Sequence, residues 1–117
     1  MISINVKVNV DEKKINNGIV RQLDKAQFAL DQEVLKDSNF YIPARDFYLR
    51  DSGVTHSRIG EGLVSWQTPY ARRLYYNPQY NFSKDKNPHA RGLWFEAAKA
   101  QNRGAWERIA QQAYDGL

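Results

Sequence analysis

The feature that most constrains this chain is a stripe of apolar residues at steps of three and four between positions 15 and 34. Side chains at that spacing share one face of an α-helix, so the stripe predicts a helix of about six turns with one buried face. Asp11 can cap its start, and residues 37–39 end it. The stripe consists of Ile15, Ile19, Leu23, Ala26, Leu30 and Val34. We therefore expect a long helix early in the chain, packed against a second layer.

Residues 2–10 alternate apolar and polar side chains from Ile2 to Val10, which predicts a half-buried β-strand. Two further short runs, 54–59 and 63–67, are separated by Gly60, Glu61 and Gly62. Runs of that length with a glycine-rich connection are typical of a β-hairpin.

The other segments have weaker signals. Residues 40–53 have mixed periodicity and a proline, which predicts a loop with extended pieces. Thr68 and Pro69 predict the cap and first residue of a short helix reaching residue 76. Residues 77–88 form a polar loop, and 92–114 read as helix, with Gly104 as a possible kink. The order predicts an α+β fold in a single domain, 1–117: a small antiparallel sheet, made of the N-terminal strand plus a β-hairpin, packed on a long N-terminal helix, with further C-terminal helices.

Composition excludes several classes of site. The chain has no cysteine, hence no disulfide framework, thiolate metal site or cysteine nucleophile, and no run long enough to span a membrane. Residues 1–39 hold six Lys and Arg and six Asp and Glu, whereas residues 40–108 hold eleven and six. That excess could attract DNA or an acidic protein surface, but its size favours a solvated face.

The triplet Asp51-Ser52-Gly53 is similar to the active-site loop of aspartic proteases. That loop should follow a buried strand, so we interpret the triplet as a tight turn leading into the hairpin. His56, expected on a strand, and His89, expected in a loop, have no spacing suited to a metal. Phosphate-loop, dinucleotide and hydrolase-elbow motifs are absent from the sequence. We expect no enzymatic activity, no cofactor and no metal.

The segment from Thr68 to Ala100 mixes aromatic and cationic side chains. Its aromatic rings could stack on bases while the cations meet phosphates, or the same residue types could anchor a protein interface. The residues alone leave both alternatives open. Some of the segment should instead pack under the sheet, namely Tyr70, Ala71, Leu74, Tyr75, Trp94 and Ala98.

A combination of short motifs runs from about residue 41 to residue 99. It comprises Pro43, Leu49-Arg50-Asp51-Ser52-Gly53, Trp66, Pro69-Tyr70-Ala71-Arg72, Tyr75-Tyr76, Asn87-Pro88 and Trp94-Phe95-Glu96-x-x-Lys99. Together these resemble the phage minor capsid protein family, small neck or tail-completion proteins from the head–tail joining clusters of tailed phages and prophages of Gram-positive bacteria. Family members commonly read Pro-x-Asp-Thr-Gly-x-Leu where this chain has Phe47 in place of the glycine turn, so the loop around 45–47 is a departure.

The resemblance implies a virion structural protein, made in the bacterial host cytoplasm, that completes the tail as a ring-like subunit at the head–tail joint. Its implied partners are other copies of itself, the connector or head-closure proteins and the tail tube, with non-specific DNA contact in the channel as a further possibility and no membrane contact. The alternative function is non-specific nucleic-acid binding through segment 68–95. The candidate protein-interface residues are Arg72, Arg73, Tyr76, Tyr80, Phe82, Lys84, Lys86 and Pro88.

Overall fold

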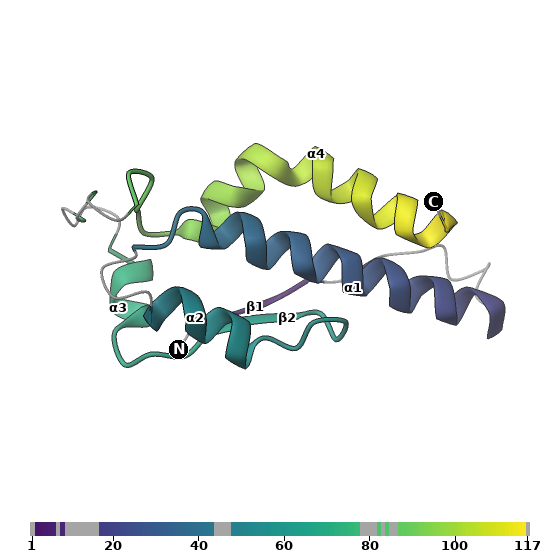
Figure 1. The fold of residues 1–117 in the computed structure, drawn as a ribbon, viewed down its shortest axis with the longest axis horizontal. Helices are drawn as coiled ribbons and strands as arrows, with labels where there is room; N and C mark the ends of the chain where they lie inside the picture. Colours follow the sequence, from purple (N-terminus) through teal and green to yellow (C-terminus); the bar gives the residue numbers. More distant parts are fainter. Residues whose placement is uncertain are drawn as a thin grey trace.

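The computed structural model describes residues 2–6, 8, 17–43, 48–77, 82, 84 and 87–116, and these form a mixed α+β fold (Figure 1). The elements are, in chain order, β1 (Ile2–Asn5), α1 (Asn17–Asn39), α2 (Tyr48–His56), β2 (Leu63–Trp66), α3 (Ala71–Tyr75) and α4 (Trp94–Asp115). This confirms the predicted fold class and the long N-terminal helix. None of the described helices combines the length and apolar character needed to cross a membrane.

Helix α1 is the centre of the molecule. It packs along α4, which runs in the opposite direction, while α2 and the two strands lie on its other side (Figure 1). The predicted stripe is confirmed where the structure describes it, because Ala26, Leu30 and Val34 are buried and Leu23 is half-buried. The side chains of Ile15 and Ile19 lie outside the described residues.

The sheet has two antiparallel strands, with Ile2 opposite Trp66 and Asn5 opposite Leu63. The predicted N-terminal strand is confirmed over Ile2–Asn5 and is shorter than expected, since residues 6 and 8 are not part of it. The second strand of the predicted hairpin is confirmed as Leu63–Trp66. The first strand of the hairpin is wrong: residues 54–56 end α2, and Arg58 contributes only an isolated bridge to Leu63. The β-branched residues of this run misled the prediction, since Val54 is two-thirds exposed on a helix and has no facing strand.

Helix α2 also corrects the loop expected at 40–53 and the turn expected at Asp51-Ser52-Gly53, because both predictions overlap this helix. Leu49, Ser52 and Gly53 share its buried face, as the helical spacing of three and four requires. A Cβ on Gly53 would lie 2.4 Å from Nε1 of Trp66, so glycine is what lets α2 approach β2. Asp51 is exposed on this helix, and His56 ends it rather than lying on a strand.

A buried carboxylate on α1 holds the turn between α2 and β2. Oδ2 of Asp31 accepts hydrogen bonds from the backbone N–H groups of Gly60 and Gly62, each 2.8 Å long, and its Oδ1 accepts one from Gln27 Nε2 at 2.8 Å. The Gln27 side chain in turn donates to the carbonyl of Val6 at 2.7 Å and accepts from the N–H of Val8 at 3.1 Å. One helix thereby fixes both the turn and the extended chain that follows β1.

Aromatic side chains join the ends of β2, α3 and α4. The rings of Trp66 and Trp94 meet edge to face with centroids 5.8 Å apart, and Tyr75 meets Trp94 in the same way at 4.7 Å. All three side chains are buried. Further along α4, Nε1 of Trp106 donates to Oδ2 of Asp37 at 2.7 Å and ties α4 to α1.

Helix α4 confirms the predicted C-terminal helix, whereas α3 begins two residues later than predicted. The N–H of Ala71 bonds to the backbone carbonyl of Thr68 at 3.2 Å, so the chain turns at Pro69 and Tyr70 before the helix starts. Within the described part of the chain, the buried Thr68 hydroxyl finds no hydrogen-bond partner, and the predicted side-chain cap is wrong.

Candidate protein-interface surface

Helix α3 divides its side chains between the core and the solvent. Ala71 and Tyr75, one helical turn apart, are fully buried, whereas Arg72, Arg73 and Tyr76 point outward and are exposed. Tyr76 keeps 59% of its surface accessible, a high value for a large aromatic side chain. We call Arg72, Arg73 and Tyr76 the α3 surface.

Tyr75 anchors this short helix. Besides its contact with Trp94, its hydroxyl donates a hydrogen bond to Oε2 of Glu96 on α4, and its carbonyl accepts from the N–H of Leu93 at 2.9 Å. Burial of the ring, together with the bond to Glu96, raises the pKa of Tyr75 far above its usual value of 10.0. The phenol therefore stays protonated and keeps α3 fixed to the start of α4.

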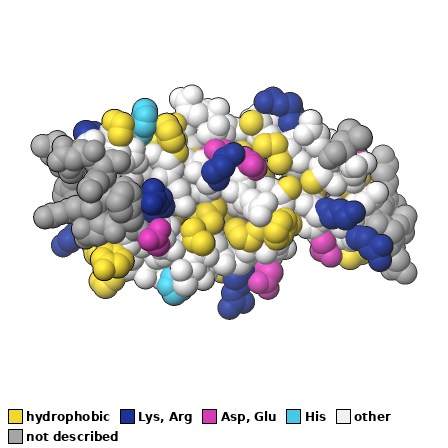
Figure 2. Space-filling view, in the orientation of Figure 1, with side chains coloured by type: hydrophobic (Ala, Val, Ile, Leu, Met, Phe, Trp, Pro, Cys, Tyr) yellow, Lys and Arg dark blue, Asp and Glu magenta, His cyan; other side chains and the backbone are white. Residues whose placement is uncertain are grey.

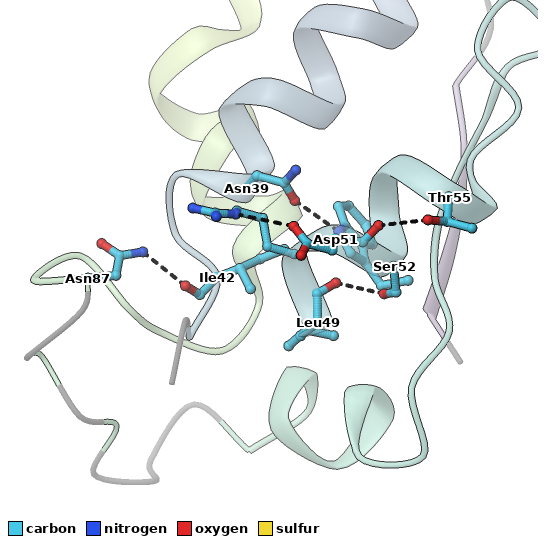
Figure 3. A network of polar contacts seen from close by, with 9 residues as sticks. Asn39, Ile42, Leu49, Asp51, Ser52, Thr55 and Asn87 are labelled. Atoms are coloured by element: carbon cyan, nitrogen blue, oxygen red, sulfur yellow. Dashed lines mark hydrogen bonds and ion pairs between the residues drawn. The ribbon is translucent and has the colours of Figure 1, made fainter. Parts of the chain in front are cut away.

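The segment before α4 is fastened to the turn after α1 by Asn87. Its Nδ2 donates to the carbonyl of Phe40 at 2.8 Å and to that of Ile42 at 2.9 Å, the latter drawn in Figure 3. Its Oδ1 accepts from the N–H of His89 at 2.9 Å. A second link runs from the N–H of Arg91 to the carbonyl of Tyr41 at 2.9 Å. The segment around Asn87 is thus held against the body of the protein.

The cations of this region interact with carbonyl groups and one ring. The guanidinium carbon of Arg72 lies 6.0 Å from the centroid of the Tyr76 ring, at the outer limit for a cation–π contact. Lys84 donates through Nζ to the carbonyl of Ala90, and Nε of Arg91 donates to the carbonyl of Gly92 at 3.1 Å. Among the described residues from 67 to 93 there is no Asp or Glu.

The structure places the candidate interface residues as follows. Three of them form the α3 surface, Pro88 and Lys84 are exposed, and Phe82 is half-buried. Tyr80 and Lys86 lie outside the described residues. Sequence reasoning missed Phe40, which is half exposed and stacks on His89 with ring centroids 4.3 Å apart. The one sequence feature that relates to this contact is Asn87, whose side chain links the segment of Phe40 to that of His89.

Other kinds of site find no support in this region. In the described part of the chain, no three His, Asp or Glu side chains come close enough together to hold a metal ion. What the region offers instead is an exposed tyrosine among cations for which the described residues provide no carboxylate partner. Such a surface can dock on another macromolecule.

The chain was compared with known proteins in three ways. A family model described as minor capsid protein matches residues 6–114, nearly the whole chain. No curated protein matches. No solved structure matches either.

Proposed function

The chain belongs to the minor capsid protein family and is thus a structural protein of a phage virion, and from this premise we propose that it completes the neck or tail as a ring-like subunit at the head–tail joint. The match over residues 6–114 carries the proposal, because it includes strand β2, helices α1 to α3 with the α3 surface, and α4 up to its penultimate residue. In this role the protein binds other virion proteins and catalyses no reaction. A tailed phage or prophage of a Gram-positive bacterium is the proposed source.

A ring subunit needs two different surfaces, since a head-to-tail contact joins one patch to another patch of the next copy. The α3 surface is the proposed first patch, because exposed Tyr and Arg side chains are the types that anchor protein interfaces. On α1, Val20 and Phe28 lie two turns apart on one side, each about half exposed (48% and 47%). They belong to the half of α1 away from α3, and we propose them as the second patch (Figure 1).

The shape of the molecule suits this arrangement. It measures 49 × 24 × 20 Å, and the α1–α4 pair runs along its length. Figure 2 shows hydrophobic side chains along the middle of one face, where a neighbouring subunit can cover them. The proposed partners are neighbouring copies, the connector or head-closure proteins and the tail tube.

Electron microscopy of a lysate from a phage that lacks this gene tests the proposed role. DNA-filled heads lying apart from finished or overlong tails are the expected result, and supplying the gene in trans should restore joined particles. Joined, infectious virions without the gene product would refute the assignment to the neck.

A substitution on the α3 surface tests the proposed patch. Tyr76→Ser removes an exposed ring, and loss of an interface anchor costs about 2 kcal/mol or more, roughly thirtyfold in affinity. We expect complementation with Tyr76→Ser to leave heads and tails apart while the purified variant keeps its helical circular dichroism. Tyr48→Ser is the matched control, because Tyr48 is exposed on α2 (69%) outside the proposed patches. Equal infectivity of both variants and the wild type would exclude Tyr76 from the interface.

A further inference from the structure

The net positive charge of the chain comes from one segment. Residues 67–95 contain five Lys and Arg and one Asp, a net charge of +4, and the rest of the chain contains twelve of each sign. The formal charge of the whole protein is also +4, so the segment carries all of it. Of its cations, Arg72 and Arg73 lie on α3 and Arg91 comes just before α4, and α3 and the start of α4 lie toward one end of the long molecule (Figure 1).

The structure leaves this charge without neutralising partners in the part that it describes. Arg72, Arg73, Lys84 and Arg91 are exposed, and within the described residues none of them pairs with a carboxylate. Ion pairs between described residues lie elsewhere: Lys36 with Glu33, Arg50 with Asp51, and Arg103 with Glu107. In the first half of α1, Asp24 lies between Arg21 and Lys25 in the sequence, and Figure 2 shows an acidic patch beside the cations at that end.

We propose that this cationic end binds the phosphate backbone of duplex DNA without reading its sequence. Its exposed polar side chains are mainly donors, and a donor-rich, strongly positive surface is typical of protein–DNA contacts. In the proposed contact between copies Tyr76 is the anchor, because the core of a protein interface is depleted of charge. The cations around Tyr76 are the groups that we assign to DNA. Duplex DNA is favoured over a single strand, because single-strand binders stack successive bases on several exposed rings. In the described part of the segment, Tyr76 is the one large hydrophobic side chain that is mostly exposed.

This inference deepens the proposed function, because a ring at the joint surrounds the path of the DNA, and in that sense it rests on the neck assignment. Its test uses only the purified protein and can therefore fail separately. If DNA binding fails, the particle phenotype of the gene deletion still stands. If virions join normally without the gene while the protein binds DNA, the neck assignment fails and nucleic-acid binding remains.

The test is fluorescence anisotropy of a labelled random-sequence duplex of 30 base pairs, titrated with protein over a series of salt concentrations. Neutralising about four phosphates predicts a slope of roughly −3.6 for log K against log salt, since each phosphate contributes about −0.9. The double substitution Arg72→Glu with Arg73→Glu should flatten that slope by about two and weaken binding at least tenfold at low salt.

The control is Arg21→Glu with Lys25→Glu, which makes the same change in net charge on exposed positions of α1. It should weaken binding by less than threefold, and circular dichroism should show both variants folded. Binding that does not respond to salt, or an equal loss in both double variants, would overturn the proposal. Poly-glutamate that displaces the duplex at equal charge concentration would point to an acidic protein partner and would overturn it as well.

Discussion

Replacing Asp31 should be among the most destabilising single changes in this protein. The carboxylate is fully buried and accepts three hydrogen bonds, from the N–H groups of Gly60 and Gly62 and from the Gln27 amide. Asp31→Ala leaves the buried N–H of Gly62 without an acceptor and frees the turn before β2. Each orphaned donor costs about 1–3 kcal/mol, and three donors lose their acceptor here. Release from burying the carboxylate offsets part of that sum, so we expect a net loss of about 3 kcal/mol.

Asp31→Asn separates the charge from the shape. The amide oxygen can still face the glycines, but its NH2 group would then meet the NH2 group of Gln27. Gln27 cannot rotate to relieve this, because its oxygen accepts from Val8 and its nitrogen donates to Val6. We expect Asn to cost about 2 kcal/mol, between the wild type and Ala.

Urea unfolding followed by tryptophan fluorescence measures both changes, since Trp66, Trp94 and Trp106 are buried. A domain of this size has about 5–15 kcal/mol of stability, so both variants should still fold at 25 °C. Asp24→Ala is the control: Asp24 is exposed on the same helix, and its removal should change the free energy of unfolding by less than about 0.5 kcal/mol. A decrease of less than about 1 kcal/mol in the free energy of unfolding of Asp31→Ala would show that the hydrogen bonds of Asp31 do not hold the turn before β2.

Two further predictions concern a pair of glycines and one tyrosine. Gly62→Ala should destabilise the protein by about 2 kcal/mol or more, because φ is +78° and the new Cβ would lie 2.5 Å from the carbonyl oxygen of Val6. Gly104→Ala should instead stabilise it by about 0.5–1 kcal/mol, because Gly104 is exposed in the interior of α4 and the new Cβ would meet only the end of the flexible Arg108 side chain. Urea unfolding of both variants tests the contrast. The raised pKa of Tyr75 means that above pH 10 the unfolded chain has lost a proton that the folded one retains, so stability falls as the pH rises, by up to about 1.4 kcal/mol per pH unit. Tyr75→Phe should make the stability less dependent on pH above 10 than in the wild type, and parallel pH curves would contradict this.

Long periodic segments made much of the fold predictable from the sequence. The stripe on α1, the alternation at Ile2–Val10 and the composition of α4 each repeat over enough residues to outweigh local exceptions. Helix α2 was not predicted, because it has only nine residues and its Ser52 and Gly53 are weak helix formers. It forms because the missing side chain of Gly53 lets the helix pack on Trp66, a tertiary contact that no local pattern contains.

The role of Asp31 was hidden for a different reason. The buried surface of α1 is wider than its apolar stripe, because Asp31, Leu35 and Ser38 are also buried, with Asp31 against the turn before β2 and Leu35 beside Gly53 of α2. Two members of that second row are polar, so a search for apolar spacing does not find it. Two of the three groups that donate to Asp31 are backbone N–H groups about thirty positions away, whose location depends on the folded turn.

The α3 surface shows how far sequence reasoning reaches toward a candidate site. The residue types pointed to Arg72, Arg73 and Tyr76, and the structure brings them together on one exposed surface. A helix of five residues has too few internal hydrogen bonds to be stable alone, so its orientation depends on Tyr75 and the chain before α4. The phenol of Tyr75 is hydrogen-bonded to Glu96 and its carbonyl to the N–H of Leu93. These bonds fix the position of α3 and thereby the orientation of the exposed residues of the α3 surface. A docking surface held in this way loses little conformational entropy when it binds, which favours either partner proposed for it.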